Sequence, residues 1–257
     1  MPLLGLPEPV GWRRGRAFLI AAIMASLLVA VFLVSLGGAA LLRGSYPTAV
    51  VTLSAALSLL PIVLALFLAA VGRTELNTTS DATGLTFWPD RRFSILAITG
   101  CVLFLPCGVA LAVLAPFGAI DIAEITWMRT ALPVGAAFAV ISIVSALIAG
   151  WRRGEVGHLK LTPSMIENAD VVRTRMWEWD DIVEVADHAQ SRKARRAVVL
   201  RVRDGHEEII TIADIYVPTG VPLYWMIRHY WKHPEDRMEL VDSRAAERFR
   251  DGRFSLD

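Results

Sequence analysis

Four long stretches of the chain contain no aspartate, glutamate, lysine, arginine or histidine: residues 17–42, 44–72, 93–120 and 131–151. A helix needs roughly 20 apolar residues to cross the hydrocarbon core of a bilayer, and each stretch reaches that length. We therefore predict a membrane all-α four-helix domain over residues 1–151, with spans at about 17–42, 46–71, 93–118 and 130–151. The densely charged residues 152–257 are predicted to form one water-soluble domain.

The composition agrees with two regions of different character. A mean hydropathy of +0.49 and an apolar content of 54% exceed the values of ordinary soluble proteins. Of the 26 lysines and arginines 8 precede residue 152, and of the 25 acidic residues 6 do, so the tail is close to neutral. This balance argues against a nucleic-acid partner. The prevalence of arginine over lysine favours a GC-rich bacterial genome, such as that of an actinobacterium.

The distribution of arginine predicts the orientation in the membrane. Arginines are frequent before the first predicted span, between the second and third, and after the fourth, whereas the other two loops hold one each, Arg43 and Arg129. Because the side richer in Lys and Arg faces the cytoplasm, both termini are expected to be cytoplasmic in a multi-pass protein of the plasma membrane. Four tryptophans beside span ends are expected in the headgroup region: Trp12, Trp88, Trp127 and Trp151.

The tail shows short alternating runs typical of strands. Strands are predicted at residues 158–161, 164–168, 171–179, 182–186, 197–203 and 208–212, with a tight turn at Asp204-Gly205. A helix is predicted from Pro222 to the residue before Pro234, and a second apolar stripe follows at Met238, Val241, Ala245 and Phe249. The expected tail is thus a β-rich domain of six or seven antiparallel strands closed by a helix.

Four short motifs in the tail carry a family resemblance. They are Leu-Thr-Pro-Ser-Met-Ile at 161–166, Trp-Asp-Asp-Ile at 179–182, Asp-Gly at 204–205 and His-Pro-Glu at 233–235. Together with the strand order, they resemble bacterial PH-like domains that are attached to membrane helices. The resemblance covers residues 155–240, roughly a third of the chain. It implies a binding or scaffolding domain and no catalytic residues.

The densest basic cluster lies between two predicted strands and comprises Arg192, Lys193, Arg195 and Arg196. A polybasic loop close to a cytoplasmic leaflet gains about 1 kcal/mol per cation from anionic lipid, so these residues are the candidate lipid or partner contact. The alternative interpretation is a solvated hairpin loop. No catalytic, cofactor-binding or metal-binding residues are predicted, because the five histidines lack metal-ligand spacings and no nucleotide or nucleophile motif occurs.

These features favour an integral membrane scaffold or regulatory protein whose PH-like domain binds a protein or an anionic lipid. Its expected partners are the bilayer, a protein partner or a second copy, and anionic lipid. Charge-free spans disfavour transport by this chain alone, because transport pathways usually contain ionisable groups. The alternatives are an accessory subunit of a transporter or channel and, third, a membrane enzyme.

Overall fold

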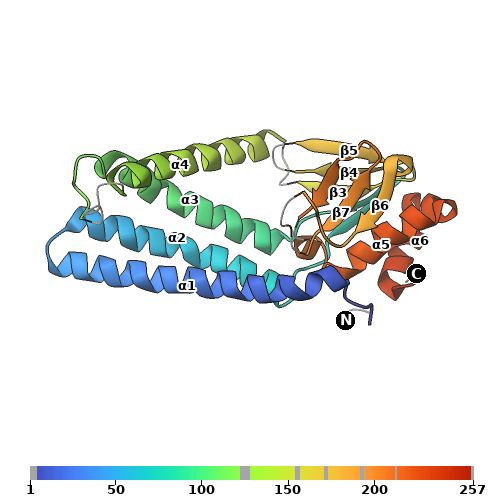
Figure 1. The fold of residues 1–257 in the computed structure, drawn as a ribbon, viewed down its shortest axis with the longest axis horizontal. Coiled ribbons are helices and arrows are strands. Elements are labelled where there is room, and N and C mark those ends of the chain that lie inside the picture. The colour runs from blue at the N-terminus through green and yellow to red at the C-terminus, as the bar shows by residue number, and fades with distance from the viewer. Residues whose placement is uncertain are drawn as a thin grey trace. The chain divides into compact units, whose positions relative to one another are not determined.

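The computed structural model describes residues 5–121, 128–153, 157–170, 173–191, 194, 196–211 and 213–255 (Figure 1). The chain divides into two compact units. The helical unit contains Ala21–Phe67 and Ser94–Arg153, and the β unit contains Met1–Ile20, Leu68–Phe93 and Gly154–Asp257. The β unit therefore draws on the tail and on two segments from the N-terminal half of the chain.

In the part of the chain that the structure describes, four long helices confirm the predicted number of candidate spans. They are α1 (Arg13–Leu42), α2 (Tyr46–Ala70), α3 (Arg91–Leu114) and α4 (Met128–Arg153). Each is long and apolar enough to cross a membrane. α1 and α3 begin earlier than predicted, because the predicted spans excluded the arginines that form the first turns of these helices. α3 ends earlier than predicted, because a turn over residues 115–118 follows it and contains Gly118 at φ +69°.

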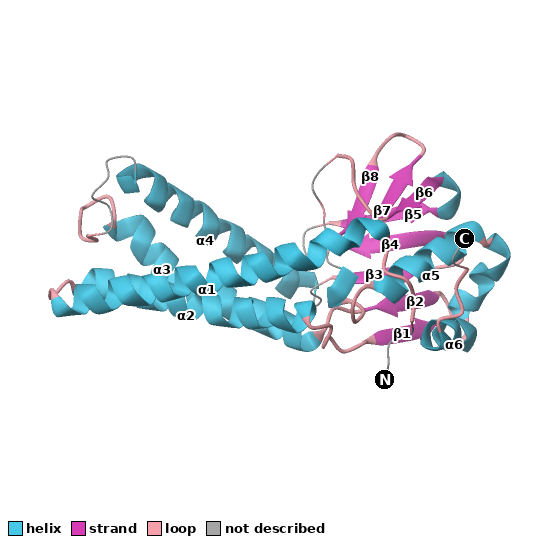
Figure 2. Ribbon diagram, turned by 60° about the horizontal axis from the view of Figure 1, so that its bottom comes forward, coloured by secondary structure: helices cyan, strands magenta, loops and turns pink. Residues whose placement is uncertain are grey.

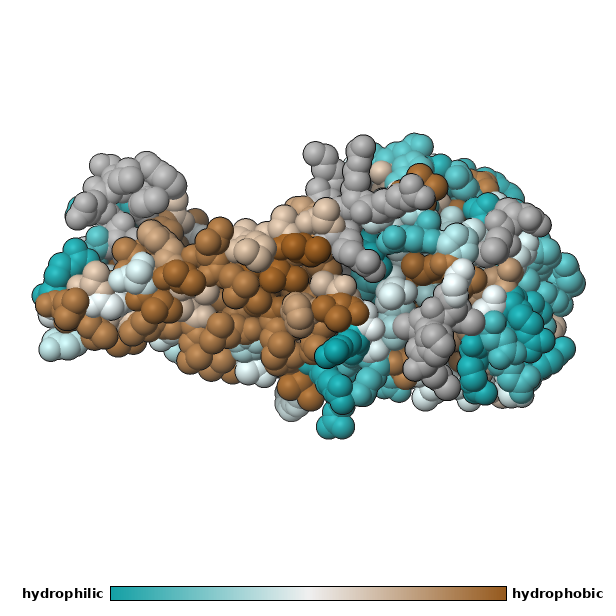
Figure 3. All heavy atoms as spheres, turned by 90° about the horizontal axis from the view of Figure 1, so that it is seen from below, coloured by the Kyte–Doolittle hydropathy of each residue, from teal (hydrophilic) through white to brown (hydrophobic). Residues whose placement is uncertain are grey.

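Side chains that would be core residues in a soluble protein are exposed on these helices. Phe138 in α4 is 74% exposed, and Phe32 in α1 is 60% exposed. Figure 3 shows apolar side chains covering the visible surface of the helices. Helices that are apolar on all sides require an apolar solvent, which is the expected environment of membrane spans.

Inside the helical unit, glycines mark the closest approach of neighbouring helices. A Cβ atom on Gly100 of α3 would lie 2.9 Å from the backbone oxygen of Ser58 and 2.5 Å from Ile62, both in α2. A Cβ atom on Gly37 of α1 would lie 2.7 Å from Leu53 of α2. Small residues at helix contacts are typical of membrane bundles, where packing drives association.

Two antiparallel sheets form the β unit (Figure 2). The first has the order β1 (Thr78–Asp81), β2 (Gly84–Phe87), β3 (His158–Leu161), β4 (Met165–Ala169), β5 (Thr174–Glu178). The second has the order β6 (Ile182–Ala186), β7 (Val198–Val202), β8 (Glu207–Ile210). All pairings in both sheets are antiparallel.

The six tail strands confirm the predicted positions, but the strand count was wrong. The connection between α2 and α3 forms the β1–β2 hairpin, and β2 pairs with β3 through Leu85↔Leu161 and Phe87↔Leu159. The described residues thus hold eight strands in separate sheets of five and three, and not the predicted six or seven antiparallel strands closed by a helix.

The core of the β unit lies between the sheets and α5 (Val221–Lys232). Leu159, Leu161 and Ile166 alternate inward from β3 and β4, and Leu223 and Ile227 project from one face of α5. The second predicted stripe is divided: a 3₁₀ segment, η4 (Pro234–Val241), precedes α6 (Ser243–Asp251). Helix α6 restarts because the Asp242 side chain caps it by accepting the Arg244 N–H.

Candidate functional site

The predicted basic run lies in the connection between β6 and β7. Three of its four cations, Arg192, Lys193 and Arg195, lie outside the described residues. The described positions on either side show how the two ends of the connection are held. These ends, Ser191 and Arg196, define what we call the β6–β7 loop.

Glu207 holds the first end of the loop. Its carboxylate accepts the backbone N–H of Gln190 at 3.0 Å and that of Ser191 at 2.8 Å. Hydrogen bonds from the Ser191 side chain and these backbone groups lower the pKa of Glu207 to about 2. The carboxylate is therefore ionised at neutral pH and binds the loop through charge-assisted hydrogen bonds.

Arg196 holds the second end from within the fold. Its guanidinium forms a bidentate pair with Asp214, at 2.7 and 2.9 Å, and donates to the Thr219 carbonyl at 2.6 Å. It also donates to Glu8 at 3.1 Å. The sequence analysis predicts that Arg196 contacts a lipid or partner together with the other three cations of the run. The structure places its side chain in the interior, between two carboxylates, and its backbone at φ +50°.

Trp12 reaches the same loop from the N-terminal segment. Its indole N–H lies 3.1 Å from the Asp187 carbonyl and 3.2 Å from the Ala197 carbonyl, and the side chain is 0% exposed. Its ring packs edge-to-face with Tyr224 of α5 at 5.9 Å between centroids. The prediction that Trp12 lies in the headgroup region was wrong, because the indole fills the core of the β unit.

Further contacts fix the residues that precede Trp12. Gly11 donates its N–H to the Asp187 carboxylate at 2.8 Å, and Trp225 of α5 donates its indole N–H to the Pro7 carbonyl at 2.9 Å. Burial opposes ionisation of Asp187, but hydrogen bonds from His188 and Gly11 outweigh it and lower the pKa of Asp187. Residues 6–12 are thus part of the folded β unit.

A depression of about 660 Å³ lies between the loop and the β7–β8 turn. It is lined by polar groups, among them Gln190, Ser191, Arg201 and His206. The Arg201 guanidinium pairs with Glu184 and Glu207, so two carboxylates surround one cation there. This local excess of negative charge makes the depression itself a poor site for an anion.

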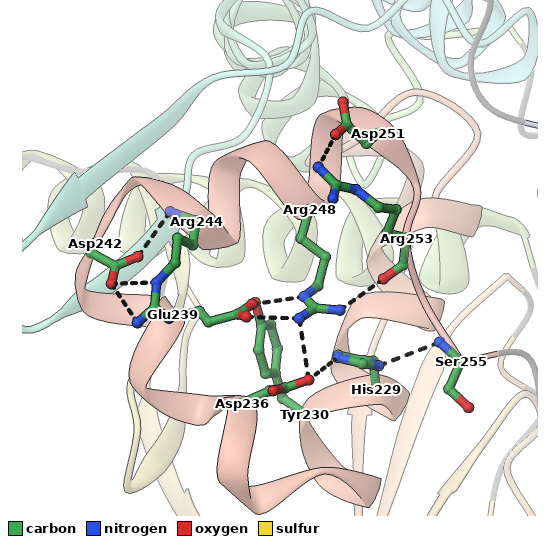
Figure 4. Close-up of polar contacts among 10 residues, drawn as sticks. All are labelled: His229, Tyr230, Asp236, Glu239, Asp242, Arg244, Arg248, Asp251, Arg253 and Ser255. Atoms are coloured by element: carbon green, nitrogen blue, oxygen red, sulfur yellow. Dashed lines mark hydrogen bonds and ion pairs between the residues drawn. The ribbon is translucent and has the colours of Figure 1, made fainter.

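A second polar cluster joins α5, η4 and α6 (Figure 4). Arg248 donates to both Glu239 oxygens at 2.7 Å and to Asp236 at 3.2 Å. The other Asp236 contact is His229 Nε2 at 3.0 Å, and the Ser255 backbone N–H donates to His229 Nδ1 at 3.3 Å. Because Nδ1 accepts, His229 is neutral with its proton on Nε2.

The second cluster resembles a nucleophile site only in residue types. The Ser255 contact to His229 uses the backbone N–H and not the hydroxyl (Figure 4). Burial and the nearby Arg248 lower the pKa of His229. These contacts hold η4, α6 and the chain end against α5, so their role is structural. Among the described residues, no three His, Cys, Asp or Glu side chains are grouped to hold a metal ion.

No known protein family, curated protein or solved structure matches this chain.

Proposed function

We propose that this chain is a regulatory or scaffold protein of the bacterial plasma membrane, whose PH-like β unit binds anionic lipid headgroups on the cytoplasmic side. The proposed contact is Arg192, Lys193 and Arg195 in the β6–β7 loop. One observation carries the proposal: both ends of this loop are fixed by carboxylates, Ser191 by a charge-assisted hydrogen bond to Glu207 and Arg196 by an ion pair with Asp214. A fixed base limits the conformational entropy that three cations lose when they engage one surface.

The connectivity of the β unit supports a location at the membrane. Trp12 is followed at once by α1, and Asp90 by α3. Asp90 also donates its backbone N–H to the Ile215 carbonyl in the tail at 2.8 Å. Segments before α1, between α2 and α3, and after α4 therefore pack together, which supports the placement of all three on one side of the bilayer. The arginine excess in these segments favours the cytoplasmic side.

The order of elements supports the PH-like assignment. Six consecutive strands, β3 to β8, precede α5, and α5 packs its apolar face on the core. The β1–β2 hairpin is an addition to that order. The described residues of the β unit form no metal-ligand group, and the His229 cluster is structural, which fits a binding function better than catalysis.

Lipid titration of the full chain in a neutral detergent tests the proposal. Short-chain phosphatidylglycerol is the probe, and bound lipid is counted by native mass spectrometry. The triple variant R192A/K193A/R195A should weaken binding roughly hundredfold, since each cation contributes about 1 kcal/mol. Arg196 stays unchanged because its loss would disturb the fold.

The matched control is R203A/R244A/R250A, which removes three exposed cations from other parts of the β unit. This control should retain most of the binding. Equal affinities for the two triple variants would refute a lipid contact at the β6–β7 loop.

A further inference from the structure

We infer that Trp12 and Glu8 are positioning residues for the β6–β7 loop, and that they couple lipid at the loop to α1. The inference rests on the proposed function, because it concerns the regulation of the same site. Both residues belong to the segment before α1, and α1 begins at Arg13, directly after Trp12. The β unit includes this segment and the first residues of α1, up to Ile20. A contact between the segment and the loop therefore reaches α1 without an intervening linker.

The Trp12 indole joins the two sides of the loop. Its N–H is shared between the Asp187 carbonyl, which precedes the loop, and the Ala197 carbonyl, which follows it, at 3.1 and 3.2 Å. The side chain is fully buried, so water does not compete for these contacts. Because one donor serves both carbonyls, displacement of Trp12 would release both sides of the loop together.

The last residue of the loop has a strained backbone conformation. Arg196 has φ +50° and Thr219, before α5, has φ +64°, and in the part of the chain that the structure describes no other non-glycine residue has a positive φ. The Arg196 guanidinium donates to the Thr219 carbonyl at 2.6 Å, so the two strained positions are bonded to each other. Strain of this kind persists only where surrounding contacts fix it, and it is frequent at ligand sites and switches. The base of the loop is thus a place where loss of a contact should change the conformation.

The segment before α1 supplies part of the contacts that fix Arg196. The guanidinium carbon lies 5.6 Å from the centroid of the Trp12 ring, and Glu8 accepts a hydrogen bond from the guanidinium at 3.1 Å. The Asp214 side chain of the other ion pair is buried, whereas the Glu8 side chain is 36% exposed. An ion pair with an exposed carboxylate is weak and reversible. The segment before α1 is therefore the side from which the loop can be released.

The entropy of the loop sets the direction of the coupling. A loop that is held in place loses less conformational entropy when it binds, so lipid should bind more tightly while the segment before α1 is docked. By reciprocity, lipid at the loop stabilises the docked segment by the same factor. Anionic lipid should therefore fix the start of α1 more firmly, and release of the segment should weaken lipid binding.

Amide hydrogen exchange of the full chain in detergent tests the positioning role without lipid. The Gln190 and Ser191 amides donate to Glu207, so their exchange reports opening of the loop. Trp12→Phe keeps a ring in the core but removes the indole donor. It should speed this exchange about fivefold, which corresponds to one hydrogen bond of about 1 kcal/mol. Glu8→Gln should speed it about twofold, because the exposed ion pair is weaker.

Trp179→Phe is the matched control. Trp179 is also buried, and its indole N–H donates to the Thr162 carbonyl in the β3–β4 turn at 2.8 Å. Both tryptophan variants should lower the melting temperature, but Trp179→Phe should leave the exchange of the loop amides unchanged. Equal exchange of these amides in the two variants would overturn the inference, because Trp12 would then have only a structural role.

A second measurement adds short-chain phosphatidylglycerol, with phosphatidylcholine as the comparison without net charge. The Gly11 amide donates to the Asp187 carboxylate, so its exchange reports release of the segment before α1. Saturating phosphatidylglycerol should slow this exchange about fivefold, and phosphatidylcholine should not. Trp12→Phe should weaken the binding of phosphatidylglycerol by the same factor, whereas Trp179→Phe should leave it unchanged.

The outcomes separate this inference from the proposed function. If the parent chain binds phosphatidylglycerol through the loop, but Gly11 exchange does not change and Trp12→Phe keeps full affinity, the inference is overturned and the lipid contact stands. If the parent chain does not bind phosphatidylglycerol, the lipid contact is refuted and the coupling of lipid to α1 fails with it. The lipid-free comparison of Trp12→Phe with Trp179→Phe then decides the positioning role of Trp12 by itself.

Discussion

The helical unit and the β unit contain the same kinds of apolar residues but arrange them in opposite ways. Phe138 of α4 is largely exposed, whereas Phe87 of β2 is fully buried against Phe249 of α6 at 5.6 Å between ring centroids. Polar groups differ as well: the β unit buries an Arg–Asp pair, while residues 17–42, 46–70, 93–114 and 130–151 of the four spans contain no charged side chain. The helical unit exposes apolar side chains on helices that are long and apolar enough to cross a membrane, whereas the β unit buries its apolar side chains in a core.

The position of a residue along the chain does not decide to which unit it belongs. Trp12 and Trp151 both lie near an end of a candidate span, but Trp12 is 0% exposed and Trp151 is 85% exposed. The β unit includes Met1–Ile20 and Leu68–Phe93, which adjoin the candidate spans in the sequence. This arrangement ties the ends of α1, α2 and α3 to the fold of the tail through covalent connections of a few residues.

The sharpest way to test this comparison is a pair of tryptophan variants. Trp12→Ala should destabilise the β unit by about 3–5 kcal/mol, because it empties a core site and leaves two carbonyls without their donor. Trp151→Ala should change the stability of the β unit by less than about 0.5 kcal/mol. Urea denaturation in mild detergent, followed by amide exchange of β3 and β7, measures both. Equal effects would show that Trp12 is not a core residue.

A buried charge gives the second largest effect. Arg196→Ala should destabilise the β unit by about 3 kcal/mol, because it removes the guanidinium that pairs with the buried carboxylate of Asp214. The exposed Arg203 provides the control, and its replacement by alanine should cost less than about 1 kcal/mol. Restoration of stability by Arg196→Ala combined with Asp214→Asn would identify the unpaired charge as the cause.

Sequence periodicity predicted the spans and the six tail strands because these signals are local. Charge-free length defines the spans, and alternation defines strands such as β7. The β1–β2 hairpin was missed because its strands have four residues each and lie between two spans, although Thr, Leu and Phe around the turn at residues 82–83 were a usable signal.

The candidate site was less predictable, since its contacts join distant residues. Arg196 has no local feature that separates it from Arg195, and its partner Asp214 is 18 positions away. Glu8 is 188 positions away and precedes the first span. A tryptophan next to a span has the same sequence position whether its indole lies in the headgroup region or in the core of a folded unit. The position of Trp12 in the sequence therefore could not distinguish these two environments. Glu207, which holds the loop, and Asp187, which holds the segment before α1, were missed for the same reason.

The junction of β2 and β3 provides a third, smaller effect. An added Cβ on Gly84 would lie 2.2 Å from the Leu161 carbonyl oxygen, so Gly84→Ala should destabilise the β unit by about 3 kcal/mol or less. Gly205→Ala, in the β7–β8 turn at φ +85° with open space around it, should cost about 1 kcal/mol. Thermal melting in detergent compares the two. A Gly205 effect larger than the Gly84 effect would contradict the docking of the hairpin.

The smallest effect concerns pH and the cluster at His229. Burial and Arg248 lower the pKa of His229 in the folded state, so the unfolded chain binds the proton first as pH falls. The contribution of the neutral ring is complete above the unfolded value of about 6.5 and is lost as pH falls below it towards the folded pKa. Denaturation midpoints between pH 7.5 and 5 should decline less for His229→Gln than for the parent chain. Parallel declines would remove His229 as a source of the pH dependence.

Residues before α1, between α2 and α3, and after α4 form one folded unit, which we expect to lie on one side of the membrane. Single cysteines at Val10, Thr83 and His206, in a background with Cys101 and Cys107 replaced by alanine, test it with a membrane-impermeant maleimide on intact cells. These three exposed positions should share one labelling class, and cysteines at Leu42 and Phe117, beside the other two loops, should share the opposite one. If the cysteine at Val10, Thr83 or His206 were labelled from the opposite side of the membrane to the other two of these three positions, the three segments could not form one folded unit on one side.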